Sequence, residues 1–204
     1  PQADYHLHSK LCGHATGEPF EYAQKAVELG LKEIGFSDHS PLLTHDDPGL
    51  TMSMSQLPQY HKMIEEVRKQ FKGKLDIKIG IESDFIPGYE SKTKDIIESY
   101  PYDYVIGSVH YIEDWGFDQP KEIKKWSDED VNEVYFKYFD LLQESARSGL
   151  FDVLAHVDLV KKFGHRPTKD LTEKIAETAR TFKENNVLIE INTSGLRKQA
   201  KEIY

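Results

Sequence analysis

Six short apolar runs alternate with longer helical patterns along the 204 residues of the chain, and this order constrains its fold more than any other feature. The apolar runs cover residues 4–7, 33–37, 76–82, 104–108, 153–156 and 187–191. Helices are expected between them over 19–29, 55–71, 91–99, 128–148 and 169–184. Such alternation is typical of an α/β fold, in which helices pack against a parallel sheet.

Potential metal ligands stand where the runs end. Five consecutive runs each deliver a histidine or a glutamate: His6 and His8, His39, Glu82, His110, and His156. The carboxyl ends of parallel strands meet at one edge of a sheet, so we expect these side chains to gather there. A single histidine after a strand is more often a core or capping residue. Five successive strand ends are improbable by chance, and the joint pattern favours a metal site.

The spacing at the first strand has a physical reason. Residues two apart in an extended chain point to the same side, so His6 and His8 can bind one ion. His14 lies in the loop just beyond and can reach a neighbouring position. Imidazoles suit zinc, iron or manganese, and a carboxylate such as Glu82 can bridge two ions.

Composition limits the class of protein. The chain is 38% hydrophobic and 30% charged, which fits one globular domain over residues 1–204. A net charge of −9 disfavours nucleic acid as a partner, although bound cations would still permit an anionic substrate. Without an apolar run of 18 residues, no membrane span is expected. The single cysteine, Cys12, excludes an internal disulfide and favours a reducing, cytoplasmic location. The oligomeric state is left open.

These motifs resemble those of the PHP family, named for polymerase and histidinol phosphatase. The resemblance rests on Asp4-Tyr5-His6-Leu7-His8, Ser37-Asp38-His39, Gly80-Ile81-Glu82, Ser108-Val109-His110 and Leu154-Ala155-His156. Within the family the chain is most similar to histidinol-phosphate phosphatases, through Cys12-Gly13-His14-Ala15 and Asn192-Thr193-Ser194-Gly195-Leu196-Arg197.

The resemblance implies a distorted (βα)7 barrel that binds up to three divalent metal ions, with zinc, iron and manganese all possible. It implies that His6, His8 and Glu82 hold the first ion and that His14 and His39 hold the second. Glu82, His110 and His156 would hold the third.

One departure from the family concerns its last motif, Ser-Asp-x-His after a seventh strand. The sequence reaches Tyr204 without it. We therefore expect the last strand and helix of the barrel in a further segment of the encoded protein. If there is no such segment, we expect weak retention of metal and weak activity.

The implied activity is hydrolysis of the small phosphate ester histidinol phosphate in histidine biosynthesis. Arg197 is a candidate to bind the phosphate, or else an ordinary surface residue. Asp84 is a candidate to bind the amino group of histidinol, or else to orient a ligand. His165 is a weaker candidate for substrate contact. Asp38 is a candidate catalytic residue that alternatively orients His39 or caps a turn.

Two other functions remain open from the sequence. One is a different metal-dependent phosphoesterase of the same family, acting on phosphotyrosine or on the end of a nucleic acid. The other is a binding or regulatory module without turnover. Catalysis by Cys12 is not expected, because no Cys-x5-Arg phosphate loop follows it.

Overall fold

The structure is a computed structural model that describes residues 3–204. It divides into two compact units, residues 1–83 with 91–106 and residues 84–90 with 107–204. The strand β4 (Tyr104–Ser108) begins in the first unit and ends in the second. In the described part of the chain, no helix combines the length and the apolar character needed to cross a membrane.

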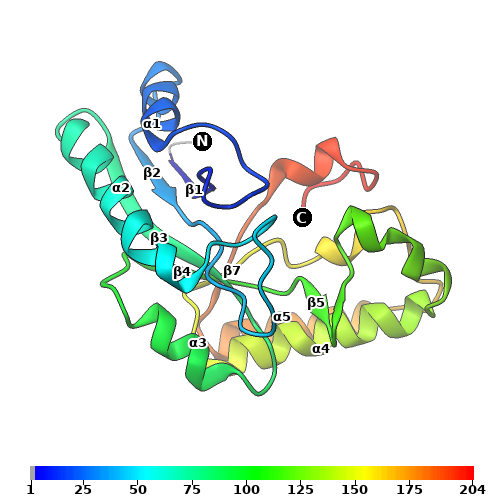
Figure 1. The fold of residues 1–204 in the computed structure, drawn as a ribbon. Helices are drawn as coiled ribbons and strands as arrows, with labels where there is room; N and C mark the ends of the chain where they lie inside the picture. Colours follow the sequence, from blue (N-terminus) through cyan, green and yellow to red (C-terminus); the bar gives the residue numbers. More distant parts are fainter. Residues whose placement is uncertain (1–2) are drawn as a thin grey trace. The chain divides into compact units, whose positions relative to one another are not determined.

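The first unit is built on parallel strands. Its strands β1 (Ala3–Leu7), β2 (Glu33–Phe36) and β3 (Asp76–Asp84) are neighbours in that order, β1 pairing with β2 and β2 with β3 (Figure 1). The helices α1 (Pro19–Glu28) and α2 (Leu57–Gln70) pack together beside them, and α3 (Glu90–Ile97) follows β3. The predicted alternation of strand and helix is confirmed here.

Local sequence signals explain where the helix α1 begins and ends. Pro19 occupies the first turn of α1, and Glu18 with Glu21 forms a capping box there. Gly30 follows the helix with a φ of +75°, a conformation that glycine adopts without strain.

Close packing between strands depends on two glycines and two tyrosines. A methyl group on Gly35 or Gly80 would lie 2.2 or 2.3 Å from atoms of the Tyr104 side chain, so only glycine fits. The buried Tyr60 hydroxyl lies 2.9 Å from the Phe36 carbonyl and 2.7 Å from that of Gly80. It therefore ties α2 to the carboxyl half of β2 and β3, next to the residues that follow these strands.

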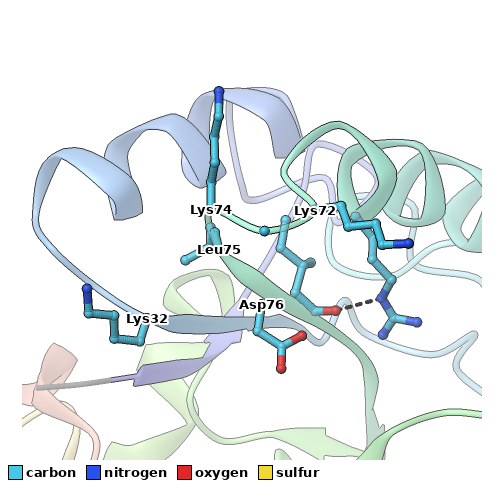
Figure 2. Close-up of a pocket in the computed structure, with 8 residues that line it drawn as sticks. Lys32, Lys72, Lys74, Leu75 and Asp76 are labelled. Carbon is cyan, nitrogen blue, oxygen red and sulfur yellow. Dashed lines mark hydrogen bonds between the residues drawn. The ribbon is translucent and has the colours of Figure 1, made fainter.

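A hollow of about 350 Å³ lies at the opposite, amino ends of β2 and β3 (Figure 2). Three lysines line it, Lys32, Lys72 and Lys74, and Arg68 donates from Nε to the Ile77 carbonyl at 2.6 Å. None of the predicted metal ligands lines this hollow.

The second unit is held by two long helices, α4 (Val131–Ser148) and α5 (Thr172–Glu184), which pack side by side (Figure 1). Its strands β7 (Val153–Leu154) and β8 (Leu188–Ile189) are parallel. The Ala155 amide, after β7, donates to the Gly107 carbonyl at the end of β4.

Several local elements differ from the prediction. The helix expected from residue 128 begins at Val131, because the Asp130 side chain caps it by accepting from the Asn132 amide at 2.8 Å. The last two strands are shorter than expected. An antiparallel pair of β5 (Tyr111–Ile112) and β6 (Trp115–Gly116) was not predicted, nor was the 3₁₀ helix Pro120–Ser127.

Candidate metal centre

The buried carboxylate of Glu82 is the centre of a histidine cluster in the first unit. Its Oε2 atom lies 3.0 Å from His6 Nε2, 3.2 Å from His8 Nε2 and 3.2 Å from His39 Nδ1. Glu82 is 1% exposed, so its charge is removed from water and needs compensation.

The strands place these side chains by backbone hydrogen bonds. His39 stands just beyond β2 and forms an isolated bridge with Glu82. The Glu82 amide donates to the Asp38 carbonyl at 3.1 Å, and the Ser40 amide donates to the Glu82 carbonyl at 2.7 Å. The side chains of His39 and Glu82 are thereby held on adjacent extended segments.

His14 joins the cluster from the loop after β1. Its ring centroid lies 5.1 Å from that of His8 and 5.2 Å from that of His39. One ligand atom from each of these three residues falls within a group no wider than 4.8 Å. His14 is exposed, so this side of the cluster is open to solvent.

Asp38 lies behind the cluster rather than in it. Its buried carboxylate accepts hydrogen bonds from the amide of Ser9, at 2.5 Å, and from the Ser9 hydroxyl. Burial raises the pKa of Asp38, and the hydrogen bonds from Ser9 oppose that rise. These contacts join the turn after β1 to the turn after β2, which favours a positioning role over direct catalysis.

The second unit brings together Asp84, His110 and His156. One oxygen of Asp84 lies 2.9 Å from His110 Nδ1 and accepts from the His110 amide at 3.1 Å. The rings of His110 and His156 are 4.9 Å apart. Because Asp84 is bound to His110, its geometry favours the orienting alternative over contact with the substrate amine.

Other polar residues near these histidines have no motif that would reveal them in the sequence. Asp118 pairs with Lys162 at 2.9 Å. Burial alone would raise the pKa of Asp118, but the charges of His110, Lys162 and His156 and the hydrogen bond from Lys162 together lower it. Glu190 accepts a hydrogen bond from the His156 amide at 3.0 Å.

The remaining substrate candidates, Arg197 and His165, both belong to the second unit. Arg197 is exposed at the end of the 3₁₀ segment Thr193–Arg197. The His165 ring stacks on Trp126, with centroids 4.5 Å apart and planes 8° apart. Stacking explains the position of His165 without a substrate, whereas Arg197 is accessible to one.

The donor set of the first unit fits a divalent metal ion. Two ligand atoms that bind one tetrahedral ion at ~2.0–2.2 Å stand ~3.3–3.6 Å apart. The separations of 3.0–3.2 Å between Glu82 Oε2 and the three imidazole nitrogens lie just below that range. Neutral imidazoles with one carboxylate are ligands suited to zinc, iron or manganese.

Comparison with known proteins gives consistent results. Residues 4–194 match the model of the PHP domain. The "Probable histidinol-phosphatase" of Deinococcus radiodurans is 41% identical over 201 residues, covering 98% of this chain and 76% of that protein. The "Histidinol-phosphatase" of Lactococcus lactis is 30% identical over 197 residues, covering 93% of this chain and 71% of that protein.

Superposition on solved structures agrees with the sequence comparison. A Listeria monocytogenes protein superposes with a TM-score of 0.88 and 26% identity, over 99% of this chain and 86% of that one. The Lactococcus lactis histidinol phosphate phosphatase, crystallised with zinc, L-histidinol and phosphate, superposes with a TM-score of 0.82 and 25% identity. The superposition covers 98% of this chain and 76% of that one. The predicted α/β fold of the PHP type is confirmed by this likeness.

Proposed function

The chain belongs to the PHP domain family, and on this premise we propose that it is a metal-dependent phosphatase that hydrolyses L-histidinol phosphate to L-histidinol and phosphate. The observation that carries the proposal is the convergence of the His6, His8 and His39 nitrogens on the buried carboxylate of Glu82. The relatives named as histidinol-phosphatases supply the substrate.

We assign metal binding to seven residues: His6, His8, His14, His39, Glu82, His110 and His156. In the first unit, His6 and His8 would share one ion with Glu82, and His14 and His39 would bind a second. Zinc is the first choice, because the Lactococcus lactis structure contains it. When bound, such cations acidify a water molecule and neutralise the charge of a phosphate ester.

The protein's own residues would orient ligands and substrate. Glu82 sets the separation of the three imidazoles around it. Asp84 fixes the ring of His110 through Nδ1, leaving Nε2 to face a ligand. Arg197 would hold phosphate oxygens through its guanidinium group.

A substrate panel tests the proposal. The protein is freed of metal with a chelator, reloaded with zinc, manganese or iron, and assayed for phosphate release. The kcat/KM for L-histidinol phosphate should exceed that for tyrosine phosphate or nucleoside monophosphates by at least about 100-fold. A site that forms hydrogen bonds with the polar groups of its substrate discriminates by that much or more against esters that lack them. Equal rates on all of these esters, or no turnover with any metal, would overturn the assignment.

A further inference from the structure

His14 differs from the other members of the histidine cluster, because no strand places it. His6 belongs to β1 and Glu82 to β3, whereas His14 is exposed in the loop beyond Leu7, where β1 ends. A loop without tertiary contacts samples many conformations, and holding its side chain in one of them costs conformational entropy. Metal binding by His14 therefore requires another part of the protein to fix this loop.

The residue two positions before His14 fixes the loop on one side. Cys12 is completely buried, and its carbonyl accepts a hydrogen bond from the Ala15 amide at 2.8 Å. Its Sγ atom accepts from the backbone amide of His39 at 2.9 Å and lies 3.3 Å from His8 Nδ1. The chain is thus anchored on the cluster immediately before it turns outward towards His14.

Gly13, between Cys12 and His14, lies directly against a second segment of the first unit. A methyl group on Gly13 would stand 2.3 Å from the Pro48 carbonyl oxygen and 2.9 Å from two backbone carbons of Gly49. These are main-chain atoms, so no side-chain rotation can make room. The φ of Gly13 lies outside the left-handed region, so space and not backbone conformation requires glycine here.

The segment that Gly13 meets is a rigid turn over residues 47–51. The Asp47 carbonyl accepts from the Thr51 amide at 2.9 Å, and the Asp47 carboxylate accepts from the Gly49 amide at 3.2 Å. A side chain that binds the backbone two residues on is a common way to stabilise a turn. Met52, which follows, is 1% exposed and belongs to the hydrophobic core, so the turn cannot retreat from Gly13 without disturbing that core.

We propose that Gly13 is a positioning residue: its lack of a side chain lets the loop after β1 rest on the 47–51 turn, and this contact places the His14 imidazole beside His39 for the second ion. The proposal rests on the proposed function only in taking His14 as a metal ligand. A side chain at Gly13 should push the loop away from the turn. The second ion should then be lost selectively, because the ligands of the first ion are placed by strands.

The position of the His14 ring can be tested without any metal. In the metal-free structure its centroid lies 5.2 Å from that of His39, and the rings of His8 and His39 are 4.7 Å apart. Nuclear Overhauser effects between ring hydrogens should therefore connect both pairs in the wild-type protein. Gly13→Ala should lose the effect between His14 and His39 and keep the one between His8 and His39. A wild-type intensity for both pairs in the variant would overturn the proposal.

Cadmium gives a separate readout for each bound ion. In ¹¹³Cd spectra of the cadmium-loaded protein, ions in different sites give different signals. Gly13→Ala should lose or broaden the signal of the ion bound by His14 and His39 and leave the signal of the ion at Glu82 in place. Zinc affinity at the weakened site, from competition with a chelating dye, should fall about 10- to 100-fold, the usual effect of removing the support of a metal ligand. Wild-type signals and affinity at every site would contradict the proposal.

Gly73→Ala is the matched control for the added methyl group. Gly73 has a φ of +81° with no atom within 4 Å of an added methyl group, and it lines the hollow at the amino ends of the strands. Alanine should lower stability there through backbone strain alone. The ring contacts of His14 and the cadmium signals should not change.

A second variant tests the same contact from the other side, and it decides the matter if Gly13→Ala does not fold. Pro48→Gly keeps the carbonyl group that faces Gly13 but frees the φ angle that proline fixes. The looser turn should weaken the second ion by about 2- to 5-fold, the size of effect expected from backbone freedom at one residue. Unchanged affinity in folded Pro48→Gly would overturn the proposal.

The outcomes separate this proposal from the proposed function. Selective loss of one cadmium signal in Gly13→Ala, together with no turnover of L-histidinol phosphate by the wild type, would overturn the function and leave the role of Gly13 intact. Full turnover by the wild type, together with unchanged ring contacts and metal affinity in Gly13→Ala, would overturn the role of Gly13 and leave the function intact.

Discussion

The phenol of Tyr138 donates a hydrogen bond to the backbone carbonyl of His156 at 2.9 Å, and His156 has a φ of +31°. Few residues other than glycine adopt such a conformation, which costs of order 1–3 kcal/mol. The His156 amide is held as well, by Glu190 at 3.0 Å. The structure thus fixes both backbone polar groups of a proposed metal ligand whose conformation is unfavourable.

Replacing Tyr138 by phenylalanine should therefore affect metal binding as well as stability. Phenylalanine removes two hydrogen bonds, because the Tyr138 hydroxyl also accepts from the Leu159 amide at 3.3 Å, and the free energy of unfolding should fall by about 1–3 kcal/mol. His156 should also relax, so that the zinc content after dialysis falls. Chemical denaturation and elemental analysis measure the two effects.

Tyr135→Phe is the matched control on the same helix. Tyr135 donates to the carbonyl of His165 at 2.7 Å, which is the same kind of bond to a residue outside the proposed ligand set. Tyr135→Phe removes this one bond, so it should cost about 0.5–1.5 kcal/mol, less than Tyr138→Phe, with the zinc content unchanged. Equal loss of zinc in both variants would show that the effect comes from α4 as a whole.

Glu82→Gln should abolish metal binding while the fold persists. The amide removes the negative charge and presents hydrogens to nitrogens that lie 3.0–3.2 Å away. We expect activity to fall by at least about 100-fold, since even indirect partners of metal ligands contribute 10- to 100-fold. The rise in melting temperature on adding zinc should also disappear.

Glu66→Gln is the comparison for that experiment. Glu66 is exposed on α2 and lies 3.9 Å from Lys62, an ion pair of little energetic value. This variant should keep both activity and the thermal shift. A Glu82→Gln protein that retained the zinc-dependent shift would contradict the central place given to Glu82.

Stability should depend on pH through His61, which lies outside the metal cluster. Its Nε2 is 2.7 Å from the Tyr102 hydroxyl and its ring stacks on Tyr100 at 3.8 Å. Burial lowers the pKa of His61 below the usual histidine value of 6.5, so the folded protein binds fewer protons than the unfolded chain just below that pH. The stability that the neutral His61 ring contributes to the fold is fully present above pH 6.5 and is lost as the pH falls through the lowered pKa.

His61→Phe keeps the ring but not the titration. Urea unfolding at pH values between 5 and 8 should show a smaller loss of stability on acidification than in wild type. His45→Gln, at an exposed histidine, should follow the wild-type curve. Parallel curves for His61→Phe and wild type would mean that other groups cause the acid sensitivity.

The sequence predicts most of the fold because hydrophobic periodicity and capping residues act locally. The first helix, expected over 19–29, is observed at Pro19–Glu28, and each expected strand overlaps an observed one. The pair β5 and β6 was missed because strands of two residues, such as Tyr111–Ile112, are too short to show alternation.

The site is predictable only as far as its motifs extend. Histidines at strand ends identify the cluster around Glu82, since topology alone brings strand ends together. Cys12, Asp118 and Tyr138 have no such signal. Their contacts with the histidines or their neighbours are made by tertiary packing, which residue spacing does not encode.

The assignment of Arg197 to the phosphate is open to a direct test. Arg197 is exposed, so alanine should leave the fold and the zinc content unchanged. If the guanidinium binds phosphate oxygens, kcat/KM for L-histidinol phosphate should fall about 10- to 100-fold, in line with ~1.5–3 kcal/mol for a hydrogen bond to a charged group. Arg197→Lys should recover only part of this, because lysine keeps the charge but loses the bidentate geometry. Lys198→Ala removes the adjacent exposed cation and should have no effect on kcat/KM. Full activity in Arg197→Ala would assign Arg197 to the surface alone and leave phosphate binding to the metal ions.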